Sequence, residues 1–372
     1  MKYFDFHGEK ISRLGFGLMR FPLLEDKTID KPQVLKMFKT AIDGGVNYFD
    51  TAWPYHDGQS EAIVKDLLVA NFPRDKFYLA DKFPGHQFFA PIPLEKIKEI
   101  FETQLERCGV EYFDFYLLHN VCETSIERYR DPQLIEYFKE QRSLGRIKHL
   151  GISSHAQTDL LDSFLTDNEG VFEFCQLQFN YLDWTLQDAK TKLEILKKHH
   201  LPMWVMEPLR GGKLAQDRED AFKFIDNKEN VGVILSGMSS LEQMQQNIET
   251  FSGDMTFTDE KEAFLLDKAE TMKDSVPCTA CGYCKAGCPM ELDIPRLIAM
   301  YNDSKFAISF APSMYIEQLP DDKKPSACIG CGACARICPQ QIDIPGVMKA
   351  FSEMKLMSWK ALCEERERAQ RK

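Results

Sequence analysis

The 372-residue sequence lacks a long apolar segment, a secretion signal and an excess of basic charge. No run approaches the ~18 consecutive apolar residues of a membrane-spanning helix. The first residues, MKYFDFHGEK, contain no apolar core of a signal peptide. The formal net charge is −11, whereas nucleic-acid binding needs clustered Lys and Arg. These absences disfavour membrane, secreted and nucleic-acid-binding proteins and predict a cytoplasmic protein.

Two cofactor signatures are also missing. A doubly wound dinucleotide-binding sheet usually carries G-x-G-x-x-G after its first strand. Here LGFGLM, at residues 14–19, supplies only two glycines and does not open a helix. No flavin motif occurs either.

Short apolar runs alternate along residues 13–238 with segments of helical period. Residues 31–43 and 94–108 are the clearest helical segments, whereas a helix in the connection 211–230 is the least clear. Eight runs are predicted as strands: 13–19, 46–52, 76–82, 113–120, 147–154, 173–180, 202–208 and 231–238. Eight βα units in about 250 residues have the size of a TIM (β/α)8 barrel. An α/β fold with this barrel over residues 1–255 is therefore predicted, with an open doubly wound sheet as the alternative.

Cysteine, by contrast, is abundant. Twelve cysteines without a signal peptide indicate thiolates that bind metal rather than disulfides. Two runs, CTACGYCKAGCP at 278–289 and CIGCGACARICP at 328–339, both have the spacing C-x2-C-x2-C-x3-C-P. That spacing is typical of bacterial ferredoxins, in which the fourth cysteine of each run serves the other cluster.

Two 4Fe-4S clusters are predicted from these runs. The ligands of the first are Cys278, Cys281, Cys284 and Cys338, and those of the second are Cys328, Cys331, Cys334 and Cys288. Zinc is the alternative, which the third cysteine and the trailing C-P disfavour. Four other cysteines have no partner at ligand spacing and are interpreted as core or incidental thiols: Cys108, Cys122, Cys175 and Cys363.

Each cysteine run is followed by a similar tail, LDIPRLIAMYN and IDIPGVMKAFS, which makes an internal repeat of 50 residues. Asp293 and Asp343 lie in these tails two residues before a proline, which is a helix-start signal. A small, mainly helical domain is predicted over 256–372, beginning with a linker helix. Its wide spacing between runs resembles the α-helical ferredoxins of some reductase subunits.

Polar residues follow three of the predicted barrel strands. Asp50, Lys82 and His119 lie at strand ends, and Tyr55 lies in the loop after Asp50. In a TIM barrel these ends form the active-site face. With YFDTAWPY, LADK, DFYLLH, GISS and EFCQLQ, residues 10–250 resemble the aldo-keto reductases, and the cysteine runs indicate a branch with a C-terminal two-cluster ferredoxin-type domain.

The resemblance implies catalytic roles for four residues. Tyr55 would be the general acid that protonates a carbonyl oxygen, and His119 would orient the substrate. Lys82, held by Asp50, would lower the pKa of Tyr55 from its usual value near ~10.

The resemblance also implies a nicotinamide cofactor. Ser153, Ser154 and Gln176 would bind the carboxamide, and Met206 stands where many members stack an aromatic ring. The loop that begins at Arg210 would approach the pyrophosphate. Gly237 and Gln243 replace the cations that often hold a 2′-phosphate, although Arg210 or Lys213 would substitute for them. The cofactor is therefore written NAD(P)H, and the expected contact residues are Ser153, Ser154, Gln176, Met206, Arg210, Gly237, Gln243 and Asn247.

The predicted function is hydride exchange between NAD(P)H and a small carbonyl or alcohol, with the clusters relaying electrons to or from a one-electron partner protein. Two alternatives remain open. The clusters could only brace the fold, or the chain could be a non-enzymatic electron-transfer or redox-sensing protein that holds a nicotinamide. No nucleic-acid or membrane partner is expected.

Overall fold

The computed structural model describes residues 1–354, apart from 89, 271, 273–274, 307–315 and 317–318. Cys363, which the sequence assigned as an incidental thiol, lies outside the described residues. The chain divides into two compact units, Met1–Leu266 and Asp267–Lys372. The boundary predicted at residue 255/256 falls just before helix α11 (Asp259–Glu270), which contains the division between these units.

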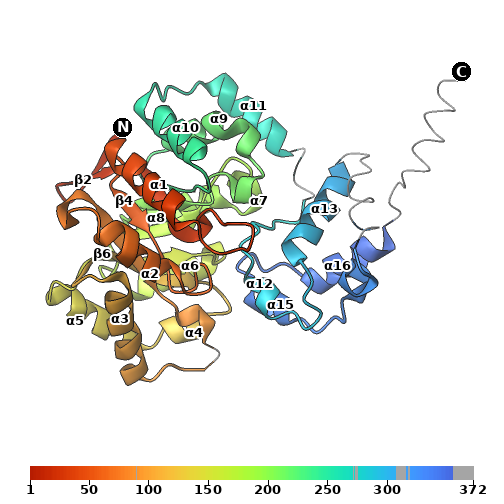
Figure 1. The fold of residues 1–372 in the computed structure, drawn as a ribbon, viewed down its shortest axis with the longest axis horizontal. Coiled ribbons are helices and arrows are strands. Elements are labelled where there is room, and N and C mark those ends of the chain that lie inside the picture. Colours follow the sequence, from red (N-terminus) through yellow and green to blue (C-terminus); the bar gives the residue numbers. More distant parts are fainter. Residues whose placement is uncertain (89, 271, 273–274, 307–315, 317–318, 355–372) are drawn as a thin grey trace, which may run out of the picture. The chain divides into compact units, whose positions relative to one another are not determined.

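The first unit is a closed barrel of eight parallel strands (Figure 1). Because β10 pairs with β3, the sheet has no free edge, so the barrel is confirmed and the open sheet is excluded. The strands are β3 (Leu14–Gly17), β4 (Tyr48–Asp50), β5 (Tyr78–Phe83), β6 (Phe113–Val121), β7 (Ile147–Ser154), β8 (Phe174–Gln178), β9 (Met203–Met206) and β10 (Val231–Gly237).

Helices follow the strands and surround the barrel (Figure 1). Those of the first unit are α1 (Lys31–Asp43), α2 (Ser60–Ile63), α3 (Leu94–Cys108), α4 (Ile126–Tyr129), α5 (Pro132–Ser143), α6 (Thr158–Asp167), α7 (Asp183–Leu186), α8 (Ala189–Lys198), α9 (Arg218–Asp226) and α10 (Leu241–Ser252). A π-helical turn, Val64–Val69, continues α2. Short 3-10 turns lie at Leu18–Arg20, Arg74–Lys76, Gly85–Gln87, Arg210–Gly212 and Ala215–Asp217.

The clearest helical segments have the ends that the sequence indicates. The Asp30 carboxylate accepts a hydrogen bond from the Gln33 N–H at 3.1 Å and caps α1. Gly109 ends α3 in the left-handed region, with φ of 68°. In the connection 211–230, two 3-10 turns precede α9, which explains its weak helical pattern.

An antiparallel hairpin that the sequence did not predict precedes the barrel. It consists of β1 (Tyr3–Phe6) and β2 (Glu9–Ser12), and each strand is too short to show a period. Phe6 and Ile11 of the hairpin are buried with Phe115, Phe174 and Trp204 from the barrel strands. The hairpin therefore contributes apolar side chains to the barrel interior.

The second unit follows the predicted repeat. In the first repeat, α12 (Tyr283–Ala286) lies within the cysteine run and α13 (Ile294–Phe306) follows it. In the second, α15 (Ala333–Ile337) lies within the run and α16 (Ile344–Glu353) follows it. The helices α13 and α16 begin directly after Asp293 and Asp343, and the Asp343 carboxylate accepts from the Gly346 N–H at 3.1 Å. Two 3-10 turns, Asp321–Lys323 and Pro325–Ala327, precede the second run.

The apolar residues of both tails form one core in this unit. Leu292, Ile294 and Ile298 of the first repeat pack with Ile344, Met348 and Phe351 of the second. Within the described residues, no helix is both long and apolar enough to cross a membrane.

The packing of the hairpin predicts a large cost for Phe6→Ala. The Phe6 side chain is 4% exposed and its ring contacts those of Phe115, Phe174 and Trp204. Loss of a buried Phe side chain costs about 3–5 kcal/mol, so the free energy of unfolding of the barrel in urea is expected to fall by that amount. Phe264→Ala is the control because Phe264 is 64% exposed. Equal stabilities of the two variants would contradict the role of the hairpin.

Candidate active site and cysteine clusters

Four polar side chains meet at the C-terminal end of the barrel strands. Asp50 is the last residue of β4, Lys82 lies near the end of β5, and His119 lies near the end of β6. These strands are neighbours, in the order β4, β5 and β6. Tyr55 comes from the loop after β4. The structure therefore brings together the four residues that the sequence predicted as catalytic.

Lys82 is the centre of this group. Its ammonium is buried and donates to the Asp50 carboxylate at 2.5 Å, to the Thr51 carbonyl at 2.7 Å and to the Tyr55 hydroxyl at 3.3 Å. An ammonium has three donor hydrogens, and each has an acceptor here. The position of the cation beside the Tyr55 hydroxyl is thus fixed by two other oxygens.

The pKa of Tyr55 differs from the sequence prediction. Burial raises it well above its usual value, and the negative charges of Asp50 and Glu207 raise it further. The net shift of the Tyr55 pKa is upward, opposite to the predicted lowering, because desolvation of the phenolate is its largest cause. Burial also raises the pKa of Asp50, although Lys82 opposes that shift. Tyr55 is therefore a protonated phenol at neutral pH.

His119 lies beside Tyr55, with ring centroids 6.0 Å apart and the rings nearly perpendicular. Burial lowers the pKa of His119 well below its usual value, and His86 and Lys82 lower it further. The imidazole is therefore neutral. Its Nδ1 atom is buried and has no hydrogen-bond partner among the described residues. An unsatisfied buried polar atom at this position is suited to a ligand.

The sequence prediction missed His86, whose ring centroid is 4.5 Å from that of His119. Tyr129 links the backbones of the two residues: its hydroxyl accepts from the backbone N–H of His86 at 3.1 Å and donates to the backbone carbonyl of His119 at 2.5 Å. Burial lowers the pKa of His86 to about 4. His86 lies three residues beyond the end of β5, so its distance from the strand weakened the sequence signal.

Three predicted cofactor residues lie on the neighbouring strands β7 and β8. Ser153 and Gln176 are paired in the sheet register. The Ser153 hydroxyl accepts from the Asn120 N–H at 2.9 Å, and the Ser154 hydroxyl donates to the Val121 carbonyl at 2.8 Å. The Gln176 carbonyl oxygen is buried without a hydrogen-bond partner among the described residues. It is the best-placed acceptor of this set for a ligand amide.

Four of the remaining predicted cofactor residues divide into two groups. Met206 and Gly237 end β9 and β10, which are neighbours, so both face the same end of the barrel. Gln243 and Asn247 on α10 are engaged internally: the Gln243 side chain accepts from the Ser239 N–H at 2.8 Å, and Asn247 donates to the Ser236 hydroxyl at 3.1 Å.

Arg210 is turned into the protein. Its side chain is 1% exposed, and its guanidinium lies 3.2 Å from the Asp183 carboxylate. Within the described residues its Nε, Nη1 and Nη2 atoms make no hydrogen bond, so a role in holding a cofactor phosphate stays a prediction.

Arg20 and Glu207 form a charged pair that the sequence prediction missed. Their side chains approach within 4.0 Å. The Arg20 side chain lies against Gly237, where a Cβ atom would be 3.1 Å from the Arg20 Cδ. Burial raises the pKa of Glu207, and Arg20 opposes the shift. Glu207 follows the last residue of β9, and this strand-end position was the available signal.

The eight cysteines of the two runs form two groups of four. One small apolar cavity is lined by Cys278, Cys281, Cys284 and Cys338, and another by Cys328, Cys331, Cys334 and Cys288. Each group takes three cysteines from one run and the fourth from the other. This is the arrangement that the sequence spacing predicted.

Backbone conformation shapes these cavities. Gly282 and Gly332 occupy equivalent positions in the two runs and have φ of 84° and 72°, which other residues rarely adopt. The Ala280 N–H donates to the Cys278 sulfur at 3.4 Å. Burial raises the pKa of Cys284, Cys334 and Cys338. Metal coordination would offset that cost because it stabilises the thiolate.

The chain matches two family models. Residues 13–229 match the aldo/keto reductase family, and residues 277–342 match a 4Fe-4S dicluster domain. The first match covers more than half of the chain, and the second contains all eight cysteines of the two cavities.

Comparison with individual proteins also finds similarity to aldo-keto reductases and other oxidoreductases. The chain is 29% identical over 151 residues to a probable aldo-keto reductase of Glycine max, covering 39% of this chain and 42% of that protein. It is 26% identical over 263 residues to the uncharacterized oxidoreductase YqkF of Bacillus subtilis, covering 69% and 79%. The match thus spans less than half of the soybean protein.

A solved aldo-keto reductase from Bacillus halodurans superimposes with a TM-score of 0.57 at 21% identity, covering 72% of this chain and 96% of that one. This likeness supports the barrel fold. With the family match over residues 13–229, the chain belongs to the aldo/keto reductase family of oxidoreductases, in a branch that carries a C-terminal 4Fe-4S dicluster domain.

Proposed function

We propose that the barrel exchanges hydride between NAD(P)H and a small carbonyl or alcohol, and that the second unit holds two 4Fe-4S clusters that relay electrons. The observation that carries the first part is the buried Lys82 ammonium, bound to Asp50 and to the Tyr55 hydroxyl at the active-site end of the barrel. The observation that carries the second is the crossed grouping of eight cysteines around two cavities.

The polar group at the strand ends suits carbonyl reduction. A bound nicotinamide would supply hydride to the carbonyl carbon. Tyr55 gives its hydroxyl proton to the carbonyl oxygen, so the carbonyl becomes an alcohol. The phenolate that remains is stabilised by the Lys82 ammonium, and solvent then returns the proton. Oxidation of an alcohol follows the same path in reverse.

His119 and Gln176 orient the reactants. A neutral His119 donates one hydrogen bond to the carbonyl oxygen without competing with Tyr55 as an acid. The unpartnered Gln176 oxygen accepts from the carboxamide N–H of the nicotinamide, and Ser153 and Ser154 line the same strand ends. Met206 would lie against the ring. Neither Gln243 nor Asn247 presents a positive charge to a 2′-phosphate, so the proposed cofactor is NAD(P)H, with no preference assigned between NADH and NADPH.

The clusters would carry single electrons, whereas the barrel would transfer hydride, which carries two. Each group of four cysteines comes from both halves of the repeat, so a bound cluster would also link the two halves of the second unit. A structural role and an electron relay are therefore separable only if cluster reduction and barrel integrity are measured on the same variants.

The first test is Tyr55→Phe, which removes only the proton donor. Carbonyl reduction is expected to slow by about 10²–10⁴-fold, the usual value of general acid catalysis. Nicotinamide affinity, measured by fluorescence titration, is expected to stay unchanged. Tyr78→Phe is the control, because Tyr78 begins β5 at the opposite end of the barrel. Wild-type turnover by the Tyr55 variant would exclude this residue as the acid.

The second test concerns cluster number and ligand grouping. Anaerobically purified protein is expected to contain about eight irons and about eight sulfides per chain. Cys338→Ser should alter the same EPR signal as Cys278→Ser, whereas Cys288→Ser should alter the signal changed by Cys328→Ser. Cys122→Ser, in the barrel, is the control. Stoichiometric zinc without sulfide would contradict the clusters, and pairing of Cys338 with Cys328 would contradict the grouping.

The third test concerns the electron relay. NADH or NADPH, added anaerobically with a carbonyl substrate or a one-electron carrier, is expected to bleach the visible absorbance of the clusters. Cys281→Ser should remove the response of one cluster while the barrel keeps its hydride transfer and its thermal unfolding. Clusters that never respond to either nicotinamide would exclude the relay, and a barrel that unfolds in this variant would favour a bracing role.

A further inference from the structure

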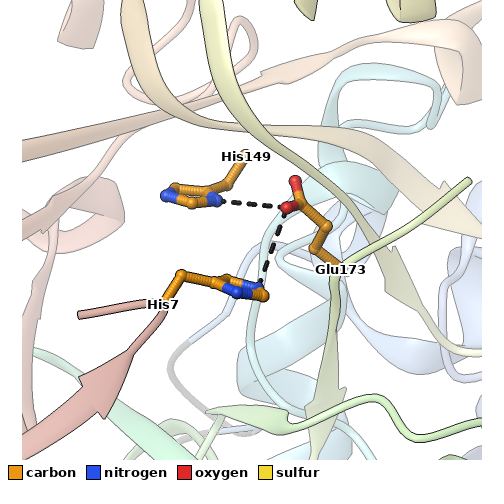
Figure 2. A group of neighbouring side chains, drawn as sticks. All are labelled: His7, His149 and Glu173. Atoms are coloured by element: carbon orange, nitrogen blue, oxygen red, sulfur yellow. Dashed lines mark hydrogen bonds and ion pairs between the residues drawn. The ribbon is translucent and has the colours of Figure 1, made fainter. Parts of the chain in front are cut away.

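Three ionisable side chains converge at the end of the barrel opposite Tyr55. His7 lies in the turn between β1 and β2, His149 lies near the start of β7, and Glu173 directly precedes β8. Figure 2 shows the two imidazole rings one above the other, both directed at the Glu173 carboxylate. One ligand atom from each residue lies within 4.8 Å of the other two. None of the three belongs to the active site described above.

The spacing of these atoms is close to that of a metal site. In tetrahedral zinc sites, ligand atoms bound at ~2.0–2.2 Å lie ~3.3–3.5 Å from one another. His149 Nδ1 lies 3.4 Å from Glu173 Oε1, and His7 Nε2 lies 3.8 Å from the same oxygen. His149 already has the required separation. His7 is on a turn and its side chain is 59% exposed, so a small rotation completes the approach.

Neighbouring groups orient the ligands toward one point. On the far side of the His149 ring, Nε2 lies 3.3 Å from the Glu9 carboxylate. A proton on Nε2 that bonds to Glu9 leaves the Nδ1 lone pair directed at Glu173. Carboxylate–histidine–metal arrangements use this same contact to fix the tautomer of the ligand.

The Glu173 carboxylate is oriented in the same way. Its Oε2 atom accepts from the Leu150 N–H at 3.2 Å and lies 3.5 Å from Arg142. The other oxygen, Oε1, faces both histidines. With the His149 proton on Nε2, the Nδ1 lone pair faces Oε1 at 3.4 Å, and a cation between these two atoms would make the contact favourable.

The group of His7, His149 and Glu173 is bordered by apolar side chains at His149 and is exposed to solvent at His7. The His149 side chain is 11% exposed, and its ring stacks on Phe115 at 5.0 Å and contacts Phe6 at 4.9 Å. A low-polarity wall strengthens a cation–carboxylate contact. His7, by contrast, is exposed, which leaves an entry path and room for a water as fourth ligand.

We propose that His7, His149 and Glu173 bind a divalent metal ion, with Glu9 as a positioning residue for His149. Two imidazole nitrogens and a carboxylate are the donor set of zinc. The ion would join the β1–β2 hairpin to two barrel strands and so fasten the hairpin on the barrel. The competing arrangement is metal-free, with a protonated His149 bridging Glu9 and Glu173.

The test uses the full chain with its cysteine clusters loaded, and zinc is the probe. Calorimetric titration is expected to give one zinc per chain, with iron and sulfide unchanged. His7→Gln and Glu173→Gln should weaken the affinity by at least about 10-fold, and Glu9→Gln by about 10–100-fold, as for other partners of metal-bound histidines. Zinc should raise the melting temperature of the wild-type barrel and leave that of His7→Gln unchanged.

His200→Gln is the matched control. His200, like His7, is an exposed histidine in the left-handed region, with φ of 57° against 52° for His7, and it should bind zinc as the wild type does. Crystals soaked in zinc should show an anomalous peak bonded to His7, His149 and Glu173. Equal zinc affinity in all four variants, no zinc uptake by cluster-loaded protein, or a peak elsewhere would each overturn the proposal in favour of the metal-free arrangement.

Discussion

The contact between the Lys82 ammonium and the Asp50 carboxylate is the constraint on which the active-site end of the barrel depends. A buried charge is costly unless it is paired and fully hydrogen-bonded. Lys82 meets this requirement through Asp50, the Thr51 carbonyl and Tyr55, which come from the end of β4 and its loop. Parallel pairing of β4 with β5 and of β5 with β6 places the C-terminal ends of the three strands side by side. Removal of one partner would leave an unpaired charge among apolar strands.

Both units bury groups that ionise, and the chemistry of these groups differs between the units. In the barrel, a cation and an anion from separate strands neutralise each other. In the second unit, the thiols of each cavity come from both halves of the repeat, and burial disfavours their ionisation. In both units, the polar or thiol groups that meet at one site come from residues far apart in the sequence.

Much of this was predictable from the sequence because the signals are periodic or regularly spaced. Strand-end polar residues such as Asp50 and His119 meet once the strands are parallel, and the cysteine spacing gave the grouping around both cavities. Contacts set by side-chain direction were not predictable. Arg210 turns inward to Asp183, and the pKa of Tyr55 depends on how deeply its hydroxyl is buried. The hairpin was missed because strands of four residues show no period.

The exchange of a fourth cysteine between the two runs has a consequence for the order of synthesis. The barrel sequence is complete before Cys278 is translated, so the barrel can fold on the ribosome. The cavity around Cys278, Cys281 and Cys284, however, lacks its last ligand until Cys338 has been made. The cavity of the first run is therefore complete only after the second run has been made, and a chain truncated between the two runs would keep three of its four cysteines.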